Sequence, residues 1–348
     1  MKLKYSKAAI LNRLRNPLVI DSIKLPNQLD AGQVLVRIEY SGICGSQIGE
    51  IDGAKGEDKY LPHLLGHEGF GEVLDIGPGV MHVSVNDKVI LHWRKGLGIE
   101  SRTPIYEWKN GKLNAGWVTT FNELAVVSEN RVTKAPIGID PKIACLFGCA
   151  ITTGFGVVTN NAQLKIGESV VVFGAGGIGL NIIQAAHLTS AWPIIAVDIF
   201  DDKLTLARQM GATHTINSKT QNAGTEIVNI LGNSDLDVFI DNTGLPDNIE
   251  LGYNMVGARG RVILVGVPKA GEKSTIFTLP LHFGKSITGS HGGEALPAID
   301  IQKYHRLFSV LNIELEKIIT HEIELTDIND AIRGIKEGKI SGRVIIRL

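Results

Sequence analysis

Two cysteines and one histidine in this chain are of the residue types that bind metal ions. They are Cys44 in SGICGSQIGE, His67 in LGHEGFGEV and Cys149 in GCAITTGFG. Two thiolates and an imidazole suit tetrahedral zinc and leave one coordination position open for a substrate. The spacings of 23 and 82 residues are far longer than those of the close ligand pairs in structural zinc sites. The pattern therefore favours a catalytic zinc site.

Each of these residues has a simpler interpretation when it is taken alone. A single cysteine is more often a small core residue than a ligand, and a nucleophilic Cys44 is a further alternative. We interpret Cys145, in the apolar run IACLFG, as a core residue of that kind. A serine at position 46 could simply hydrogen-bond a turn. The combination of residues, rather than any one of them, predicts the metal site.

A second group of residues predicts a dinucleotide-binding loop. Gly174, Gly176 and Gly179 form a G-x-G-x-x-G pattern after the apolar run VVVF and at the start of a helical pattern. In such loops the glycines allow a tight turn, close approach of a pyrophosphate to the backbone, and close packing of helix on strand. Asp198, 19 residues after Gly179, ends the next predicted strand. Its carboxylate would bind the adenosine ribose and repel a 2′-phosphate, so we predict NAD as the cofactor.

Other residues are predicted to complete the NAD site. Lys203 lies at the start of the next helix and can reach the same ribose. The alternative interpretation, ordinary turn glycines with Asp198 as a helix cap, leaves the strand-helix-strand context unexplained. The remaining predicted cofactor contacts in this half of the chain are Gly177, Ile178, Thr243, Val265 and Val267.

The elements that must position these residues fall into two groups. Between residues 31 and 136, short apolar runs separated by Gly, Pro and Asn are typical of antiparallel strands. From about residue 167, buried strands alternate with helical patterns, as in a parallel, doubly wound sheet. Residues 321–348 predict a strand, a helix capped by Thr326 or Asp327, and a last strand. This tail is too small to bury its own core, so we expect it to pack on the N-terminal β domain.

The composition fits a globular protein of two domains and narrows its partners. The chain has 348 residues, 44% of them hydrophobic, and a formal net charge of −1. Without a basic tract, nucleic acid and anionic membranes are not expected partners. Three cysteines do not form a disulfide framework, and no apolar run suits a signal peptide or a membrane span. We therefore expect a cytoplasmic protein.

The order of these motifs resembles the medium-chain dehydrogenase/reductase superfamily, and within it the zinc-dependent alcohol dehydrogenases, along essentially the whole chain. The resemblance implies a GroES-like β domain at 1–150, completed by 292–348, and a Rossmann domain at 151–291. It implies a homodimer or homotetramer, with edge strands near 275–283 (TIFTLPLHF) as one contact. The segments that carry the resemblance are SGICGSQ, LLGHEGFGEV, GCAITTGFG, VVVFGAGGIGL, AVDIFDDKL and GRVIIRL.

The resemblance also implies a reaction, the reversible NAD-linked oxidation of a small-molecule alcohol to an aldehyde or ketone. Catalytic zinc, held by the two cysteines and the histidine, makes the alcohol more acidic, and hydride then passes to the nicotinamide. Glu68 is implied beside the metal as an exchange ligand, and Ser46 as the hydroxyl that takes the alcohol's proton. Arg343 is implied as the cation for the pyrophosphate.

Three departures from the family pattern qualify these expectations. Gln47 and Gly49 stand where many members have an acidic residue and a relay histidine. The relay should then run through cofactor hydroxyls and water, through His92, or through another group. The amide oxygen of Gln47 is expected to orient His67 in place of the carboxylate. Residues 92–117 lack the four cysteines of the family's structural zinc, so we expect only the catalytic ion.

The same segment contains a basic and aromatic group of residues. We interpret this group either as a solvated loop or as a rim for a polar substrate, such as a polyol, a sugar or a phosphorylated alcohol. A zinc-free quinone or enoyl-type reductase and a non-catalytic nucleotide-binding protein are the alternative functions. The residues of the group are Trp93, Arg94, Arg102, Trp108 and Lys109.

Overall fold

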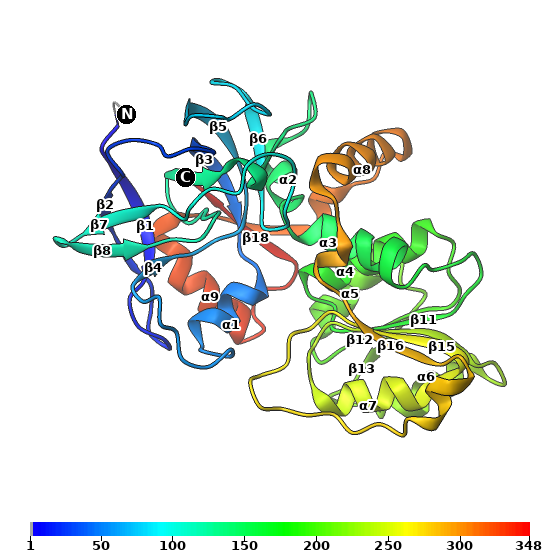
Figure 1. Cartoon of the computed structure of the whole chain (residues 1–348). Coiled ribbons are helices and arrows are strands. Elements are labelled where there is room, and N and C mark those ends of the chain that lie inside the picture. Colours follow the sequence, from blue (N-terminus) through cyan, green and yellow to red (C-terminus); the bar gives the residue numbers. More distant parts are fainter. Residues whose placement is uncertain (1–2) are drawn as a thin grey trace. The chain divides into compact units, whose positions relative to one another are not determined.

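The computed structural model describes residues 3–348, which form two compact units (Figure 1). The first unit contains the chain up to Thr152 together with Leu296–Leu348, and the second is Thr153–Ala295. None of the helices within the described residues is both long enough and apolar enough to cross a bilayer.

The first unit is built around two β-sheets. Their bounds are β1 (Tyr5–Leu11), β2 (Val19–Lys24), β3 (Gln33–Gly42), β4 (His63–Leu64), β5 (Glu68–Ile76), β6 (Lys88–His92), β7 (Ile105–Trp108), β8 (Gly111–Asn114), β9 (Leu124–Ser128), β10 (Val132–Lys134), β17 (Ile319–Glu324) and β18 (Arg343–Arg347). One sheet has the order β1-β2-β7-β8-β4 and closes on itself, because β4 pairs back with β1. The other has the order β10-β6-β5-β3-β18-β17, and β9 also pairs with β3.

Strand β3 contributes to two of the hydrophobic cores of this unit. Because successive side chains of a strand point to opposite faces, Val34 and Val36 pack in one core with Val89. Leu35 packs in the other core with Ile10. The alternating apolar runs of the sequence are therefore explained by a layer that is buried on both faces.

The first unit also contains helices, of which α9 packs against the C-terminal strands. Their bounds are α1 (Gly45–Ile51), α2 (Pro141–Leu146), α8 (Pro297–Leu311) and α9 (Ile328–Lys336), and α3 (Ala150–Gly156) begins in this unit. Helix α9 buries Ile328 and Ile332, one turn apart, in a cluster with Ile48 of α1 and Ile346 of β18. The tail packs as expected, since β18 pairs antiparallel with β3. Asp327 is at the N-cap position of α9, but its side chain makes no capping hydrogen bond.

The second unit is a doubly wound parallel sheet. Its strands are β11 (Val170–Phe173), β12 (Ile194–Asp198), β13 (His214–Asn217), β14 (Leu236–Asp241), β15 (Val256–Leu264) and β16 (Ser286–Gly289). Its helices are α4 (Gly177–Leu188), α5 (Asp201–Gln209), α6 (Ala223–Leu231) and α7 (Pro246–Met255). The strand order β13-β12-β11-β14-β15-β16 is the Rossmann order, with every neighbouring pair parallel. The predicted fold class is confirmed.

One expected strand of this unit is absent from its predicted position. Residues 275–278 are irregular, and a 3-10 helix covers Leu279–Phe283. Pro280 has no N–H group to donate to a strand ladder, and it begins this helical turn instead. The edge strand is β16, a few residues further along the chain.

Candidate functional site

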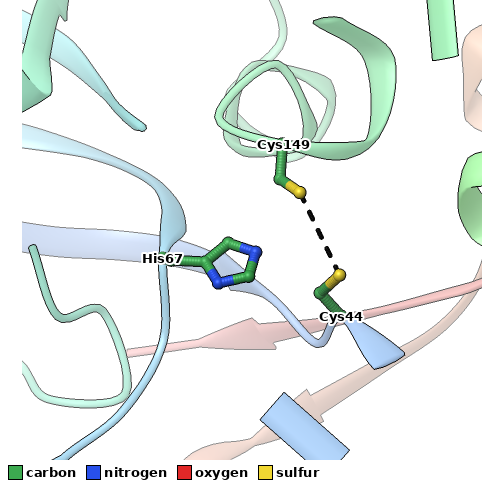
Figure 2. A group of neighbouring side chains, drawn as sticks. All are labelled: Cys44, His67 and Cys149. Carbon is green, nitrogen blue, oxygen red and sulfur yellow. Dashed lines mark hydrogen bonds between the residues drawn. The ribbon is translucent and has the colours of Figure 1, made fainter. Parts of the chain in front are cut away.

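Three segments of the first unit bring Cys44, His67 and Cys149 together. Cys44 is the N-cap residue of α1, His67 directly precedes β5, and Cys149 directly precedes α3. Their ligand atoms all lie within 4.8 Å of one another, and the two sulfur atoms are 4.0 Å apart. In Figure 2 the imidazole ring and both thiols point into one shared space.

The chemistry of these three side chains fits a zinc ion. The Nε2 atom of His67 is buried, and no residue in the described part of the chain hydrogen-bonds it. Cys44 and Cys149 are buried and form no disulfide. The hydrogen bond with Cys149 holds the pKa of the Cys44 thiol well below its ordinary value, against burial, which raises it; His67 and Arg343 lower it further. A ready thiolate beside an unpartnered ring nitrogen is a suitable donor set for zinc.

Gln47 connects two of these residues through its side-chain amide. Its Oε1 accepts a hydrogen bond of 3.2 Å from the Cys44 backbone N–H, and its Nε2 contacts Nδ1 of His67. The sequence correctly indicated Gln47 as the neighbour of His67, but the amide nitrogen faces the ring. The amide oxygen of Gln47 instead accepts the hydrogen bond from the N-cap residue of α1, Cys44. The sequence pattern did not reveal this contact.

Glu68 and Arg343 form a buried ion pair beside this site. Glu68 is fully buried and Arg343 is 3% exposed, and Arg343 Nη2 contacts Glu68 Oε1. The other carboxylate oxygen accepts a hydrogen bond of 3.1 Å from the Ala150 N–H. The role of Arg343 as a pyrophosphate ligand stays a prediction. What the structure adds is its pairing with Glu68.

The two candidates for proton transfer have very different surroundings. Ser46 is exposed in the first turn of α1. His92 is buried, with Nδ1 2.7 Å from the Arg94 carbonyl oxygen and Nε2 2.9 Å from Thr133 Oγ1. Burial lowers the pKa of His92 to about 4, so the ring is neutral at physiological pH. Its hydrogen bonds make His92 a structural residue rather than a relay to solvent.

The basic and aromatic segment does not form a single rim. Trp93 lies beside His67, with ring centroids 6.4 Å apart, and the Arg94 guanidinium is 5.8 Å from the Trp93 ring centroid. Trp108 lies on β7 instead, where it is buried and donates a hydrogen bond of 2.8 Å to Asp21. Lys109 sits over Trp108. Strands β7 and β8 form a hairpin here, so Trp108 belongs to a core, and that part of the expectation was wrong.

The glycine loop of the second unit has the geometry of a dinucleotide-binding turn. Gly174 has φ +91°, which favours glycine, and Gly176 is the N-cap of α4. A Cβ atom at Gly179 would collide with the Gly174 carbonyl oxygen, whereas one at Gly176 would meet open space. The helix N-terminus and its free N–H groups suit a pyrophosphate. Gly177 and Ile178 form the first turn of this helix.

Asp198 is hydrogen-bonded to this loop. Its Oδ2 accepts a hydrogen bond of 2.8 Å from the Ala175 N–H, and its Oδ1 accepts one of 2.8 Å from the Ile199 N–H. The Lys203 ammonium is 3.7 Å from Oδ1. The carboxylate therefore links the end of β12 to the glycine loop, and Lys203 is close enough to act at the same position.

The remaining predicted cofactor contacts follow β14 and β15, and Asp241 holds them together. The buried Asp241 carboxylate accepts hydrogen bonds from Thr243 Oγ1 and from the Gly244 N–H. Its backbone oxygen accepts one of 2.7 Å from the Val265 N–H, and the backbone of Val267 packs against Gly244. Sequence reasoning did not identify Asp241. The only signal was an acidic residue at the end of an apolar strand.

A second group of side chains was also not anticipated. Glu50, Asp58 and His63 place ligand-type atoms within 4.8 Å of one another. The Nε2 atom of His63 is 2.8 Å from an oxygen of Asp58 and 4.0 Å from an oxygen of Glu50. These residues lie in the first unit, on α1, on the loop after it and on β4.

A β unit that carries a thiolate and imidazole site, together with a Rossmann unit, is the architecture of a two-domain dehydrogenase. Comparisons with known proteins agree. Residues 30–137 match the family model described as alcohol dehydrogenase GroES-like domain, and residues 177–310 match that of zinc-binding dehydrogenase. The S-(hydroxymethyl)glutathione dehydrogenase of Paracoccus denitrificans is 31% identical, and the alignment covers 98% of this chain and 99% of the relative.

Other relatives and solved structures extend this agreement. The NDMA-dependent alcohol dehydrogenase of Amycolatopsis methanolica is 27% identical, over 96% of each chain. The crystal structure of benzyl alcohol dehydrogenase from Acinetobacter calcoaceticus matches with a TM-score of 0.88 at 27% identity, covering 99% of this chain and all of the other. The chain belongs to the zinc-type alcohol dehydrogenases of the medium-chain dehydrogenase/reductase superfamily.

Proposed function

We propose that this protein oxidises an alcohol to an aldehyde or ketone, reversibly and with NAD, at a single catalytic zinc ion. The observation that carries the proposal is the convergence of the Cys44 and Cys149 thiols on the unpartnered Nε2 atom of His67. Zinc held there would act as a Lewis acid that makes the alcohol's hydroxyl proton easier to remove.

The other residues of the first unit have supporting roles. Ser46, exposed two residues after Cys44, accepts the hydroxyl proton. Glu68 is a carboxylate beside the site that can enter the ligand set during exchange, and it is paired with Arg343 in the buried interior. Because residues 92–117 contain no cysteine, we infer that no second, structural zinc is bound there.

The second unit supplies the nucleotide site and sets its preference. The glycine loop receives the pyrophosphate, and Asp198 accepts hydrogen bonds from the adenosine ribose. A carboxylate at this position repels a 2′-phosphate, so NAD is the better oxidant. Lys203 contributes a hydrogen bond to the same ribose.

Two residues near the metal site suggest the class of substrate. Trp93 beside His67 offers an aromatic face, and Arg94 offers a cation for a polar or anionic group. A small alcohol with a polar substituent, such as a polyol, a sugar or a phosphorylated alcohol, fits these two residues. The names of the relatives add benzyl alcohol and S-(hydroxymethyl)glutathione as probes.

The test combines metal analysis with activity. Purified protein is expected to contain about one zinc per chain and to form NADH from members of a panel of benzyl alcohol, S-(hydroxymethyl)glutathione, polyols and sugar phosphates. Less than about one zinc for every two chains would favour a zinc-free reductase. Zinc-replete protein that binds NAD but forms no NADH across the panel would favour a non-catalytic nucleotide-binding protein.

We also propose that the protein is a homodimer or homotetramer in a reducing compartment such as the cytoplasm. The edge strand β16 has unpaired backbone groups, and Phe277 and Phe283 before it are 67% and 72% exposed. Light scattering should give at least twice the 37.6 kDa of one chain, and Phe283→Glu should lower the measured mass. Cys44 and Cys149, which form no disulfide with each other or with Cys145, fit a reducing environment.

A further inference from the structure

The geometry points to a binding site for a second divalent cation, formed by Glu50, Asp58 and His63. The ligand-type atoms of these residues lie within 4.8 Å of one another. They come from the last turn of α1, from the loop after it and from β4. The site shares no residue with the candidate zinc site, so the inference goes beyond the proposed function and does not depend on it.

The ring of His63 requires a cation at its Nε2 atom. Its Nδ1 is 2.9 Å from the Leu64 carbonyl oxygen, and its Nε2 is 2.8 Å from Oδ2 of Asp58. A neutral imidazole has one hydrogen, so it can donate to one of these acceptors and turns a lone pair towards the other. The side chain is only 9% exposed, so solvent does little to relieve that repulsion. Either a second proton or a metal ion therefore lies between Nε2 and the carboxylate.

The charge of this group favours a divalent ion over a proton. Glu50 adds a second carboxylate, with Oε1 4.0 Å from Nε2 of His63. Within residues 3–348, neither Glu50 nor Asp58 has a lysine or arginine at salt-bridge distance. A protonated ring balances one of the two negative charges, whereas a divalent ion bound to the neutral ring balances both.

The distances suit an ion with octahedral coordination. Ligand atoms at about 2.1 Å from such an ion are about 3.0 Å apart when adjacent and about 4.2 Å apart when opposite. The 2.8 Å and 4.0 Å from Nε2 to the two carboxylates are close to these values, whereas a tetrahedral ion would hold every pair at about 3.4 Å. Carboxylates suit Mg²⁺ and Mn²⁺, and an imidazole ligand favours the transition metal. Mn²⁺ is therefore the probe that matches this donor set.

Hydrogen bonds from outside the group hold two of the three ligands. The Leu64 carbonyl accepts from Nδ1 of His63, which leaves Nε2 as the metal-binding atom. Metal-binding histidines commonly donate their other N–H in this way. The Oδ1 atom of Asp58 accepts a hydrogen bond of 2.8 Å from the Tyr60 N–H, so Oδ2 remains for the ion. Glu50 is the adjustable ligand, because its side chain is 37% exposed.

A bound ion would restrain the loop between α1 and β4. Residues 52–62 contain turns and bends but neither helix nor strand. Glu50 lies before this loop, Asp58 within it and His63 directly after it. One ion that binds all three closes the loop on itself, so its expected role is to stabilise the loop rather than to take part in the reaction.

The first test titrates the zinc-loaded, full-length protein with Mn²⁺ and follows the free ion by electron paramagnetic resonance. Thiolates select zinc, so the candidate zinc site should not take up Mn²⁺, and about one Mn²⁺ per chain should bind. Asp58→Asn and Glu50→Gln each remove one carboxylate and should weaken binding by at least about 10-fold. Glu57→Gln is the matched control, because it removes the same charge from an exposed neighbour in the loop. It should bind Mn²⁺ like wild type.

The histidine has its own pair of variants. His63→Gln removes the nitrogen ligand and should also weaken Mn²⁺ binding by at least about 10-fold. His321→Gln replaces an exposed histidine of β17 and should leave the affinity unchanged. Because Glu50 is partly exposed, Glu50→Gln still tests the site if His63→Gln does not fold.

Trypsin gives a local measurement of the same site. Lys55 and Lys59 are exposed in the loop. At a Mn²⁺ concentration of about 10 times Kd, cleavage of the opened loop after these lysines should slow by about 10-fold in wild type. Asp58→Asn should lose this protection, and Glu57→Gln should keep it.

The outcomes decide between a metal site and a protonated ion pair. If wild type binds Mn²⁺ no more tightly than Asp58→Asn and Glu50→Gln, His63 and Asp58 form only an ion pair and the inference is overturned. Equal weakening by Glu57→Gln would also overturn it, since that result means general attraction to an acidic loop. None of these measurements uses NADH formation, so failure of the proposed function and failure of this inference are separate results.

Discussion

The sulfur atoms of Cys44 and Cys149 lie 4.0 Å apart, although 105 positions separate the two residues in the chain. A disulfide would require about 2.05 Å. Two thiolates that bind one tetrahedral zinc at about 2.3 Å are separated by about 3.8 Å. The spacing is therefore that of two ligands of one ion.

Removing one thiolate should abolish zinc binding. Cys149→Ser leaves two protein ligands, so metal analysis should give well under half a zinc per chain, against about one for wild type. The matched control is Cys145→Ala. Cys145 is also buried, but its Sγ donates a hydrogen bond to the Lys142 carbonyl oxygen and burial raises its pKa. Cys145→Ala should lower stability yet keep its zinc, and equal zinc loss in both variants would contradict the assignment.

Replacing Gln47 with glutamate should strengthen zinc binding. A His67 that binds metal through Nε2 carries a hydrogen on Nδ1, and that hydrogen needs an acceptor. The single oxygen of the Gln47 amide already accepts from the Cys44 N–H, whereas a carboxylate has two oxygens. Competition with a chelator should give an affinity about 10-fold higher for Gln47→Glu. Gln302→Glu, on the exposed face of α8, is the control, and an unchanged or weaker affinity for Gln47→Glu would refute the argument.

Removing the Asp198 carboxylate should reduce the preference for NAD. The variant Asp198→Ala loses the ribose acceptor and the repulsion of a 2′-phosphate, while Lys203 remains as a cation. The ratio of kcat/KM for NAD over NADP should fall by about 10- to 100-fold, the equivalent of one hydrogen bond to a charged group. Asp202→Ala, in the exposed first turn of α5, should leave the ratio unchanged. An unaltered ratio in Asp198→Ala would show that another residue selects the cofactor.

Acid should destabilise the first unit through His92. Burial lowers the pKa of this ring from 6.5 to about 4. Between these values the unfolded chain binds a proton that the folded chain does not, so the free energy of unfolding falls as the pH drops from 6.5 towards 4. The full effect is about 3 kcal/mol. Urea unfolding at several pH values should have a shallower pH dependence in His92→Gln than in wild type or His321→Gln, and identical slopes would exclude His92 as the cause.

Breaking the buried ion pair should cost far more than breaking an exposed one. Arg343→Gln leaves the fully buried Glu68 carboxylate without its cation, which should lower the free energy of unfolding by about 3–5 kcal/mol. The pair between Arg347 and Glu324 is 60% and 56% exposed, so Arg347→Gln should cost at most about 1 kcal/mol. Denaturant titrations give both values. Equal losses would mean that Glu68 is neutral or finds another partner.

The fold could be predicted from the sequence where apolar runs and glycines mark strands and turns. The glycine loop, the β14 run LDVFID and helix α4 occur at the predicted positions. A short apolar run bounded by turn residues is typical of a strand that is buried on both faces of a parallel sheet. The strand expected at TIFTLPLHF failed for a local reason, since Pro280 starts a helical turn there. Trp108 was expected at a rim and is buried, because the β7–β8 hairpin turns it towards a core.

The sequence by itself determined the residue types of the site, the nucleotide loop with its acidic partner, and the two kinds of unit. Tertiary structure decided which side chains meet. The pairing of Glu68 with Arg343, the division of the Gln47 amide between Cys44 and His67, and the cluster of Glu50, Asp58 and His63 all join residues from different segments. Hydrophobic and glycine patterns report the burial and the turns of one segment at a time. Contacts between distant polar groups depend on strand register and on the rotamers that packing allows, and these arise only when the whole unit folds.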